Sequence, residues 1–150
     1  MKTLLMTVGL ALSYTANAQW ITKTVDNGFD PKYNIAYTDN TKMQWLKLED
    51  YNNGVSFYIG GVYVCDDDVD VDISFLVNGE YKKFKIENCD VSDDRKTVFF
   101  TDNLELNEML PSFIASTLVK VRINDITCGE STYEFKMNNS TAAFNFIDKD

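Results

Sequence analysis

The most regular pattern in this sequence is VSFYIGGVYVCDDDVDVDISFLVNGEYKKFKI, at residues 55–86, in which apolar and polar residues alternate over most of the length. Alternation with a period of two places successive side chains on opposite faces of the chain and is typical of β-strands. The stretch also holds Asn78-Gly79, a common sequence for a two-residue hairpin turn. We therefore predict two antiparallel strands joined at Asn78-Gly79.

The turn at Asn78-Gly79 sets the register of this hairpin. Counting outward from it gives three favourable cross-strand pairs, namely Leu76–Tyr81, Ser74–Lys83 and Asp72–Lys85. The apolar residues at every second position from Val69 to Val77 then face the core, and the residues between them face outward.

A pair of glycines, Gly60-Gly61, interrupts the alternation. Before the pair the apolar residues fall at odd positions from Val55 to Ile59, and after it they fall at the even positions Val62 and Val64. One extra residue in a strand shifts the alternation in this way, so we predict a β-bulge at Gly60-Gly61.

The rest of the chain carries short β-prone segments, separated by turn signals at intervals of about ten residues. These segments are residues 20–25, 33–38, 43–49, 96–101, 118–124 and 132–137. A short helix is predicted near 103–110, capped by Asp102-Asn103 and ended by Pro111. The fold class that we predict is all-β, a two-sheet antiparallel β-sandwich of about 8–9 short strands with this one helix.

Residues 1–18, MKTLLMTVGLALSYTANA, have the pattern of a secretory signal peptide. Lys2 precedes an apolar run from Leu4 to Leu12, and Ala16-Asn17-Ala18 has the small-x-small arrangement that signal peptidase cleaves. The apolar run is about half of the ~20 residues that a membrane-spanning helix needs. We expect cleavage after Ala18, one domain over residues 19–150 in the periplasm or outside the cell, and no stable membrane insertion afterwards.

The chain is acidic, with a formal net charge of −9 at pH 7. Residues 1–18 contain one charged residue, Lys2, so their removal changes this value to −10. Nucleic acid is disfavoured as a partner, because its phosphates require a basic surface. The charge fits either simple solubility or attraction to a cationic protein.

Three cysteines, Cys65, Cys89 and Cys128, allow one intramolecular disulfide in an oxidising compartment. In the predicted hairpin Cys89 faces Asp68, three residues along the strand from Cys65, so Cys65–Cys89 is the first pairing that we expect. Pairing of Cys65 with Cys128 across two sheets, as in immunoglobulin-like domains, is the second. The remaining thiol is expected to be buried or to pair with another molecule.

The sequence contains no histidine. This excludes Ser-His-Asp and Cys-His catalytic arrangements and the imidazole ligands that most zinc sites use. The cysteines are far apart and form no Cys-x-x-Cys motif, which argues against thiolate zinc and thioredoxin-like chemistry. We expect a protein that is not an enzyme and that needs no organic cofactor.

A run of aspartates, DDDVDVD at residues 66–72, is the remaining candidate site. Asp66, Asp68 and Asp70 have the spacing of the first ligands of an EF-hand, but Val71 stands where that loop needs glycine. A different calcium site could be built from Asp66, Asp67 and Asp68 together with Asp90, Asp93 or Asp94 at the open end of the hairpin.

The same run has two other interpretations. As a solvated strand end, it would keep an exposed edge from pairing with other chains. As an interaction site, it would contact a protein partner through the following residues: Asp66, Asp67, Asp68, Asp70 and Asp72.

Three further features occur together: Gln19-Trp20 followed by Asp26 and Asp30, the basic strand LVKVRI at 118–123, and the ending FKMNNSTAAF at 135–144. In these features the chain resembles a group of small exported β-sandwich proteins of bacteria and their phages, among them proteins described as similar to invasion-associated locus B. The resemblance implies an extracytoplasmic β-sandwich of bacterial or phage origin that acts by binding, and it transfers no catalytic residue.

Three functional hypotheses follow. The first is an exported binding module that engages another extracytoplasmic protein through its acidic surface or an exposed sheet face. The second is an inhibitor of a cationic secreted enzyme, such as a lysozyme or a protease, toward which the negative charge would steer it. The third is an accessory structural protein of a phage or a cell surface.

Overall fold

The computed structural model describes residues 20–29, 31–40, 42–51, 54–101, 103–138 and 140–147. The expected signal peptide, residues 1–18, and the expected helix-capping residue Asp102 lie outside these ranges. Within them, neither helix has the length and apolar character needed to cross a membrane.

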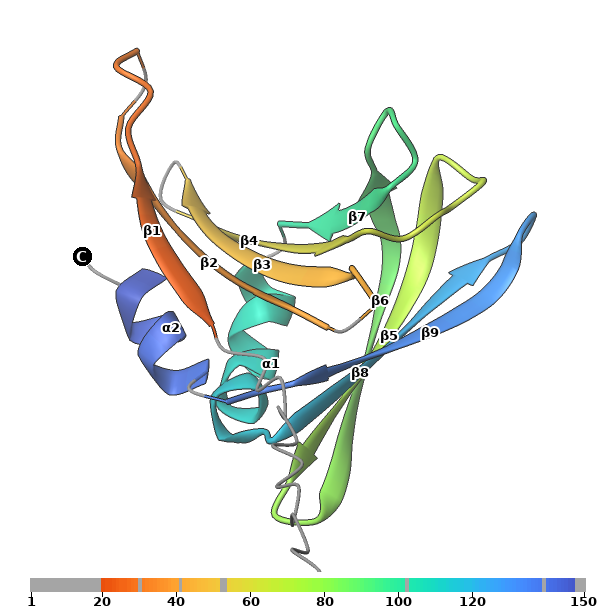
Figure 1. Ribbon diagram of the computed structural model, residues 1–150. Helices are drawn as coiled ribbons and strands as arrows, with labels where there is room; N and C mark the ends of the chain where they lie inside the picture. The colour runs from red at the N-terminus through yellow and green to blue at the C-terminus, as the bar shows by residue number, and fades with distance from the viewer. Residues whose placement is uncertain are drawn as a thin grey trace, which may run out of the picture.

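Nine antiparallel strands form one sheet in the described part of the chain, accompanied by two short helices (Figure 1). The strands are β1 (Ile21–Val25), β2 (Tyr33–Asp39), β3 (Trp45–Tyr51), β4 (Gly54–Gly60), β5 (Asp68–Val77), β6 (Glu80–Val91), β7 (Thr97–Phe100), β8 (Leu118–Asp125) and β9 (Gly129–Lys136). The helices are α1 (Asn103–Ala115) and α2 (Ser140–Ile147). The mainly β character of the prediction is therefore confirmed.

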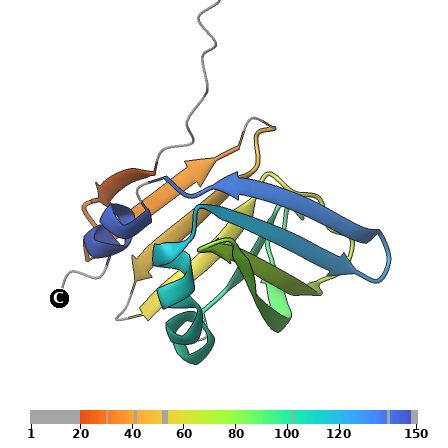
Figure 2. The same cartoon turned by 90° about the horizontal axis from the view of Figure 1, so that it is seen from below.

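The strands belong to two blocks that β7 connects. The order across the sheet is β1-β2-β3-β4-β7-β6-β5-β8-β9, so β1 to β4 form one block and β6, β5, β8 and β9 form the other. β7 pairs with β4 through Phe57–Phe100 and its neighbours, and with β6 through Asp90–Phe99 and Val91–Val98. Because β7 continues the hydrogen bonding between the blocks, the described strands form one sheet and not the two that we predicted. Figures 1 and 2 show this sheet strongly bent, so that its two blocks run in different directions.

The central hairpin has the predicted register, which is confirmed at Leu76–Tyr81, Ser74–Lys83 and Asp72–Lys85. The odd-numbered residues of β5 from Val69 to Val77 are buried, as the alternation predicts. The register shifts by one residue between Val69 and Val71, so Cys89 faces Val69 and not Asp68.

The change of alternation at Gly60-Gly61 has a different cause from the predicted bulge. β4 ends at Gly60, and Gly61 has a φ of +70°, a left-handed conformation that glycine adopts without strain. The chain then leaves the sheet until β5 begins at Asp68. In this interval the amide of Val64 donates to the carbonyl oxygen of Arg95 at 3.1 Å, which keeps the Val64 side chain directed into the core.

We expect Gly61→Ala to lower the free energy of unfolding by roughly 2–3 kcal/mol. A Cβ at this position would lie 2.4 Å from the carbonyl oxygen of Met43, in addition to the cost of the positive φ. Gly129→Ala is the matched control, because Gly129 has a φ of +85° but open space around an added Cβ, and it should cost about 1 kcal/mol. Urea denaturation measures both; equal losses would mean that the contact with Met43 carries no energy.

Helix α1 continues through Pro111, whereas we predicted that Pro111 ends it. Proline removes the backbone hydrogen bond to the carbonyl of Asn107, four residues earlier. Asn107 is exposed, so water can reach this turn, and the additional helical turn buries Phe113 against Trp20 and Phe57. The apolar burial of Phe113 outweighs the missing hydrogen bond.

Helix α2 is an element that we did not predict. Its buried residues are Ser140, Ala143, Phe144 and Ile147, a spacing that matches one face of a helix. This face packs against β2 and α1. The helical spacing was therefore present in the sequence and was the signal that could have found α2.

Candidate functional site

The disulfide joins Cys65 to Cys128, the second of the two pairings that we predicted. The first pairing, Cys65–Cys89, is not formed, because the Cys89 side chain is buried in the core with its Sγ 3.8 Å from the carbonyl oxygen of Ile86. The bond connects residues 61–68, which follow β4, to residues 125–129, which join β8 to β9. We call these two segments the disulfide rim.

Asp125 is the buried hydrogen-bond centre of the disulfide rim. Its Oδ2 accepts from the amide of Cys65 at 2.6 Å, and its Oδ1 accepts from the amides of Cys128 and Thr127 at 2.7 and 2.9 Å. Burial by itself raises the pKa of the Asp125 carboxyl, but the hydrogen bonds from the amides of Cys128 and Cys65 and from Asp66 together lower it below its ordinary value. The carboxylate thus holds both ends of the disulfide in place.

Asp66 also binds the turn that joins β8 to β9. Its Oδ2 accepts from the amides of Ile126 and Thr127 at 2.9 and 3.1 Å, and its Oδ1 accepts from the Thr127 hydroxyl at 2.6 Å. Asp67 forms an ion pair with the Arg95 guanidinium at 2.6 Å, and Arg95 also donates to the carbonyl oxygen of Cys65. Both aspartates are therefore bound to groups of this chain.

The structure does not bring Asp66, Asp67 and Asp68 together as a set of metal ligands. Asp66 faces the β8–β9 turn, Asp67 faces Arg95, and Asp68 begins β5. Calcium binding by these residues stays a prediction, and an ion there would have to displace the donors that now occupy the carboxylate of Asp66. In the described ranges, the one group of three closely spaced ligand types is Cys65, Asp125 and Cys128, and the disulfide uses two of these.

The other two predicted partner-binding residues, Asp70 and Asp72, follow Asp68 on the outer face of β5, and Asp70 lines a hollow together with rim residues Asp125 and Ile126. Asp70 pairs with Lys85 at 3.1 Å and accepts from the amide of Asn88 at 3.2 Å. Asp72 accepts from the side-chain amide of Asn124 at 3.1 Å. The five aspartates of the run therefore extend from the disulfide rim onto the outer face of β5.

Large apolar side chains project from the disulfide rim into solvent. Ile126 is 98% exposed, and Tyr63, two residues before Cys65, is 69% exposed. The backbone beside each is held, since the amide of Ile126 donates to Asp66 and the chain after Tyr63 is fixed by the disulfide. These two side chains are thus presented by a backbone that loses little freedom when a partner binds.

We expect Asp125→Asn to lower the free energy of unfolding at neutral pH by roughly 2 kcal/mol, because its NH2 group would face a backbone N–H donor. The folded-state pKa of Asp125 is below its ordinary value, so its contribution is present above that value and is lost as the pH falls through the folded-state pKa. The variant should therefore lose less stability than the wild type between about pH 5 and pH 2. Urea unfolding of both proteins across this pH range tests the prediction. An equal loss of unfolding free energy in the wild type and the variant would contradict it.

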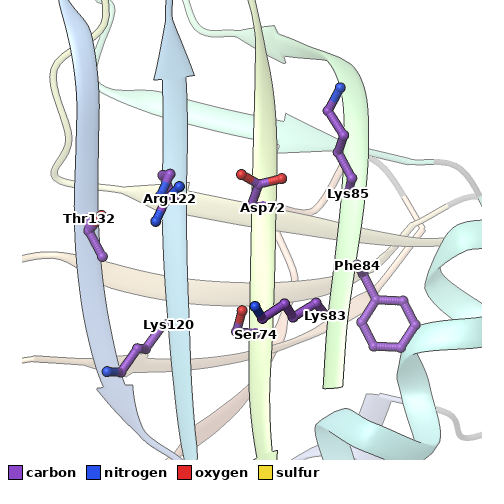
Figure 3. Close-up of a pocket in the computed structure, with 8 residues that line it drawn as sticks. All are labelled: Asp72, Ser74, Lys83, Phe84, Lys85, Lys120, Arg122 and Thr132. Atoms are coloured by element: carbon purple, nitrogen blue, oxygen red, sulfur yellow. The ribbon is translucent and has the colours of Figure 1, made fainter. Parts of the chain in front are cut away.

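A second surface lies on the outer face of β6, β5, β8 and β9, where two rows of side chains cross the strands (Figure 3). The strand registers give the rows Lys83, Ser74, Lys120, Glu134 and Lys85, Asp72, Arg122, Thr132. We call Lys83, Lys85, Lys120 and Arg122, together with Asp72 and Ser74 between them, the cationic face. These residues and Thr132 border a hollow of about 380 Å³.

Acidic side chains surround the cationic face and pair with its cations. The ion pairs are Lys85–Glu87 (2.8 Å), Lys85–Asp70 (3.1 Å), Lys120–Glu134 (3.4 Å) and Arg122–Glu130 (4.0 Å). Glu87 and then Asp70 raise the pKa of Lys85, which keeps this amine protonated. Lys83 makes no ion pair or hydrogen bond with the residues that the structure describes.

Sequence reasoning found part of this surface. The pairs that place Lys83 and Lys85 beside β5 follow from the hairpin turn, and the alternation in residues 118–124 puts Lys120 and Arg122 on one polar side. That β8 lies beside β5, which brings the four cations together, has no local signal in the sequence.

No protein-family model matches the chain, and neither the curated proteins nor the solved structures include a significant match. The geometry of the disulfide rim and of the cationic face is therefore the basis for assigning a function.

Proposed function

We propose that this protein is an exported, non-catalytic binding module that recognises a basic extracytoplasmic protein through the disulfide rim. The observation that carries the proposal is the exposure of Ile126 on a turn that Asp66, Asp125 and the disulfide hold. Exposed apolar side chains on a preorganised backbone are efficient contact residues, because little conformational entropy is lost on binding.

Charge defines the kind of partner. The chain has a net charge of −9, and the Asp67 side chain in the rim is 92% exposed despite its ion pair with Arg95. A negative surface around apolar contact residues favours a positively charged protein and increases its association rate.

The disulfide supports a periplasmic or secreted location. Cys65–Cys128 closes a loop of the folded domain, and such bonds persist mainly in oxidising compartments. The pattern of residues 1–18 leads to the same location.

Photo-crosslinking from the rim tests the proposal. A photoreactive amino acid replaces Tyr63 or, as the matched control, Phe29, which is 95% exposed in the β1–β2 connection. We expect one basic protein from a periplasmic or extracellular extract to crosslink at position 63 and not at position 29. Adding Ile126→Ser should abolish this product, whereas equal crosslinking from both positions would refute binding through the rim.

Inhibition of a cationic secreted enzyme is a narrower form of this proposal. It is favoured by Ile126, a single apolar side chain on a firmly held turn, which is a suitable shape for an enzyme cleft. Residual activity of lysozymes and secreted proteases, measured with wild type and with Ile126→Ser, distinguishes inhibition from simple binding. The role as a phage or cell-surface accessory protein stays a prediction.

A further inference from the structure

We propose that the cationic face binds an acidic oligosaccharide, a chain of sugars that carries carboxylate or sulfate groups. This surface shares no residue with the disulfide rim, so the inference is independent of the proposed protein partner. It starts from an unequal distribution of charge. Although the chain has a net charge of −9, four of its cations surround Ser74 and Asp72, which are neighbours on the outer face of β5.

The strand registers determine the geometry of these cations. Lys83 on β6 and Lys120 on β8 flank Ser74, one on each side. Two residues further along β5, Lys85 and Arg122 flank Asp72 in the same way. With neighbouring strands ~4.8 Å apart, each row from β6 to β9 spans about 14 Å, which is longer than one sugar ring.

The cations are available to a ligand. Lys85, Lys120 and Arg122 have partners at the margin of the face, but their side chains are 53%, 39% and 51% exposed, and exposed ion pairs are weak. A ligand's acid group can therefore replace a marginal carboxylate at little cost. Figure 3 shows Lys83 extending along its own row toward Ser74.

The groups between the cations select the class of ligand. Asp72 would repel a ligand whose contacts are all negative, but its carboxylate accepts hydrogen bonds from hydroxyl groups. The hydroxyls of Ser74 and Thr132 lie in the same hollow and both donate and accept. A ligand that combines many hydroxyls with spaced negative charges fits this arrangement better than a phosphate or a nucleic acid does.

An aromatic ring adjoins the polar rows. Tyr81 is 43% exposed, and its ring lies 5.3 Å from the Lys120 amine. In the register, Tyr81 faces Leu76, which in turn faces Leu118, so an apolar strip borders the cationic face. The apolar face of a sugar ring can pack on this strip while its acid group reaches Lys120 and Lys83.

Calorimetric titration of the full-length mature protein tests the inference with four probes. Trigalacturonate carries carboxylates, a heparin-derived tetrasaccharide carries sulfates, galactotriose is neutral, and a five-nucleotide oligothymidylate is a polyanion with few hydroxyls. We expect at least one of the two acidic sugars to bind, and the one that binds more tightly identifies the acid group. Galactotriose and oligothymidylate should bind at least about tenfold more weakly.

Two neighbouring lysines supply a matched pair of variants. Lys83→Gln removes a cation from the face, whereas Lys82→Gln removes one from the opposite side of the same strand, because Lys82 faces Phe75 in the register. Lys83→Gln should weaken binding of the acidic sugar about fivefold, and Lys82→Gln should leave it within about twofold.

Asp72→Asn separates a sugar site from a simple anion site. The amide of asparagine accepts hydrogen bonds from sugar hydroxyls more weakly than the carboxylate does, so acidic-sugar binding should weaken about fivefold although the variant face is more positive. Three results would overturn the inference: no binding of either acidic sugar, equal effects of the two lysine variants, or tighter binding of both oligothymidylate and sugar to Asp72→Asn. Circular dichroism of each variant confirms that these effects come from a folded protein.

Discussion

Phe113→Ala is expected to lower the free energy of unfolding by about 3–5 kcal/mol. The Phe113 ring is 3% exposed and makes edge contacts with the rings of Trp20, Phe57 and Phe75, at centroid distances of 5.3, 6.3 and 6.0 Å. Its removal would leave a cavity between α1 and the sheet that the surrounding side chains fill only in part. Urea denaturation followed by tryptophan fluorescence measures the loss.

Phe29→Ala is the control for this substitution. The Phe29 ring is 95% exposed, so its removal should change the free energy of unfolding by no more than about 0.5 kcal/mol. The comparison also tests the course of α1 beyond Pro111, because Phe113 reaches the core only if the helix continues. A loss below about 1 kcal/mol in Phe113→Ala would contradict this course.

Replacing Cys65 and Cys128 together by serine is expected to lower the free energy of unfolding by about 4 kcal/mol in the chain-entropy model. The bond links residues that are 63 positions apart, and its removal increases the conformational freedom of the unfolded chain over that distance. Urea denaturation of the oxidised wild type and the double variant measures the difference. Reduction of the wild type gives the same quantity if the double variant does not fold.

Cys89→Ala is the control that identifies the pairing. This variant keeps Cys65 and Cys128, so a reductant should destabilise it by as much as it destabilises the wild type. If Cys65 were paired with Cys89, the variant would have no intramolecular bond of that kind and the reductant would have no effect. The size of the effect of reductant, and not the stability of Cys89→Ala itself, is therefore the decisive measurement.

The parts of the fold that the sequence predicted well depend on near neighbours. Asn78-Gly79 allows the left-handed backbone of a tight turn, and the alternation on either side then leaves one register for the hairpin. The prediction failed first at Val69–Val71, where a register shift changes the partner of Cys89. No residue type announces that shift in the sequence.

The helices show how packing overrides local preference. Pro111 is a strong local signal to end a helix, but burial of Phe113 among distant aromatic side chains supplies more free energy than one backbone hydrogen bond. In α2 the opposite applies, since the spacing of Ser140, Ala143, Phe144 and Ile147 is a helical signal that the sequence contains.

The sequence by itself determined the hairpin at Asn78-Gly79 and the sides of β5 and β8 that face the core, because turn preference and alternation act over a few residues. Only the tertiary structure decided that Cys65 meets Cys128, and that β8 lies beside β5, so that Lys120 and Arg122 join Lys83 and Lys85 on one face. The order of strands in a sheet comes from packing between segments far apart in the chain, and many orders satisfy the same alternation. Local sequence patterns therefore predicted individual residues of each candidate binding surface but not how these residues come together.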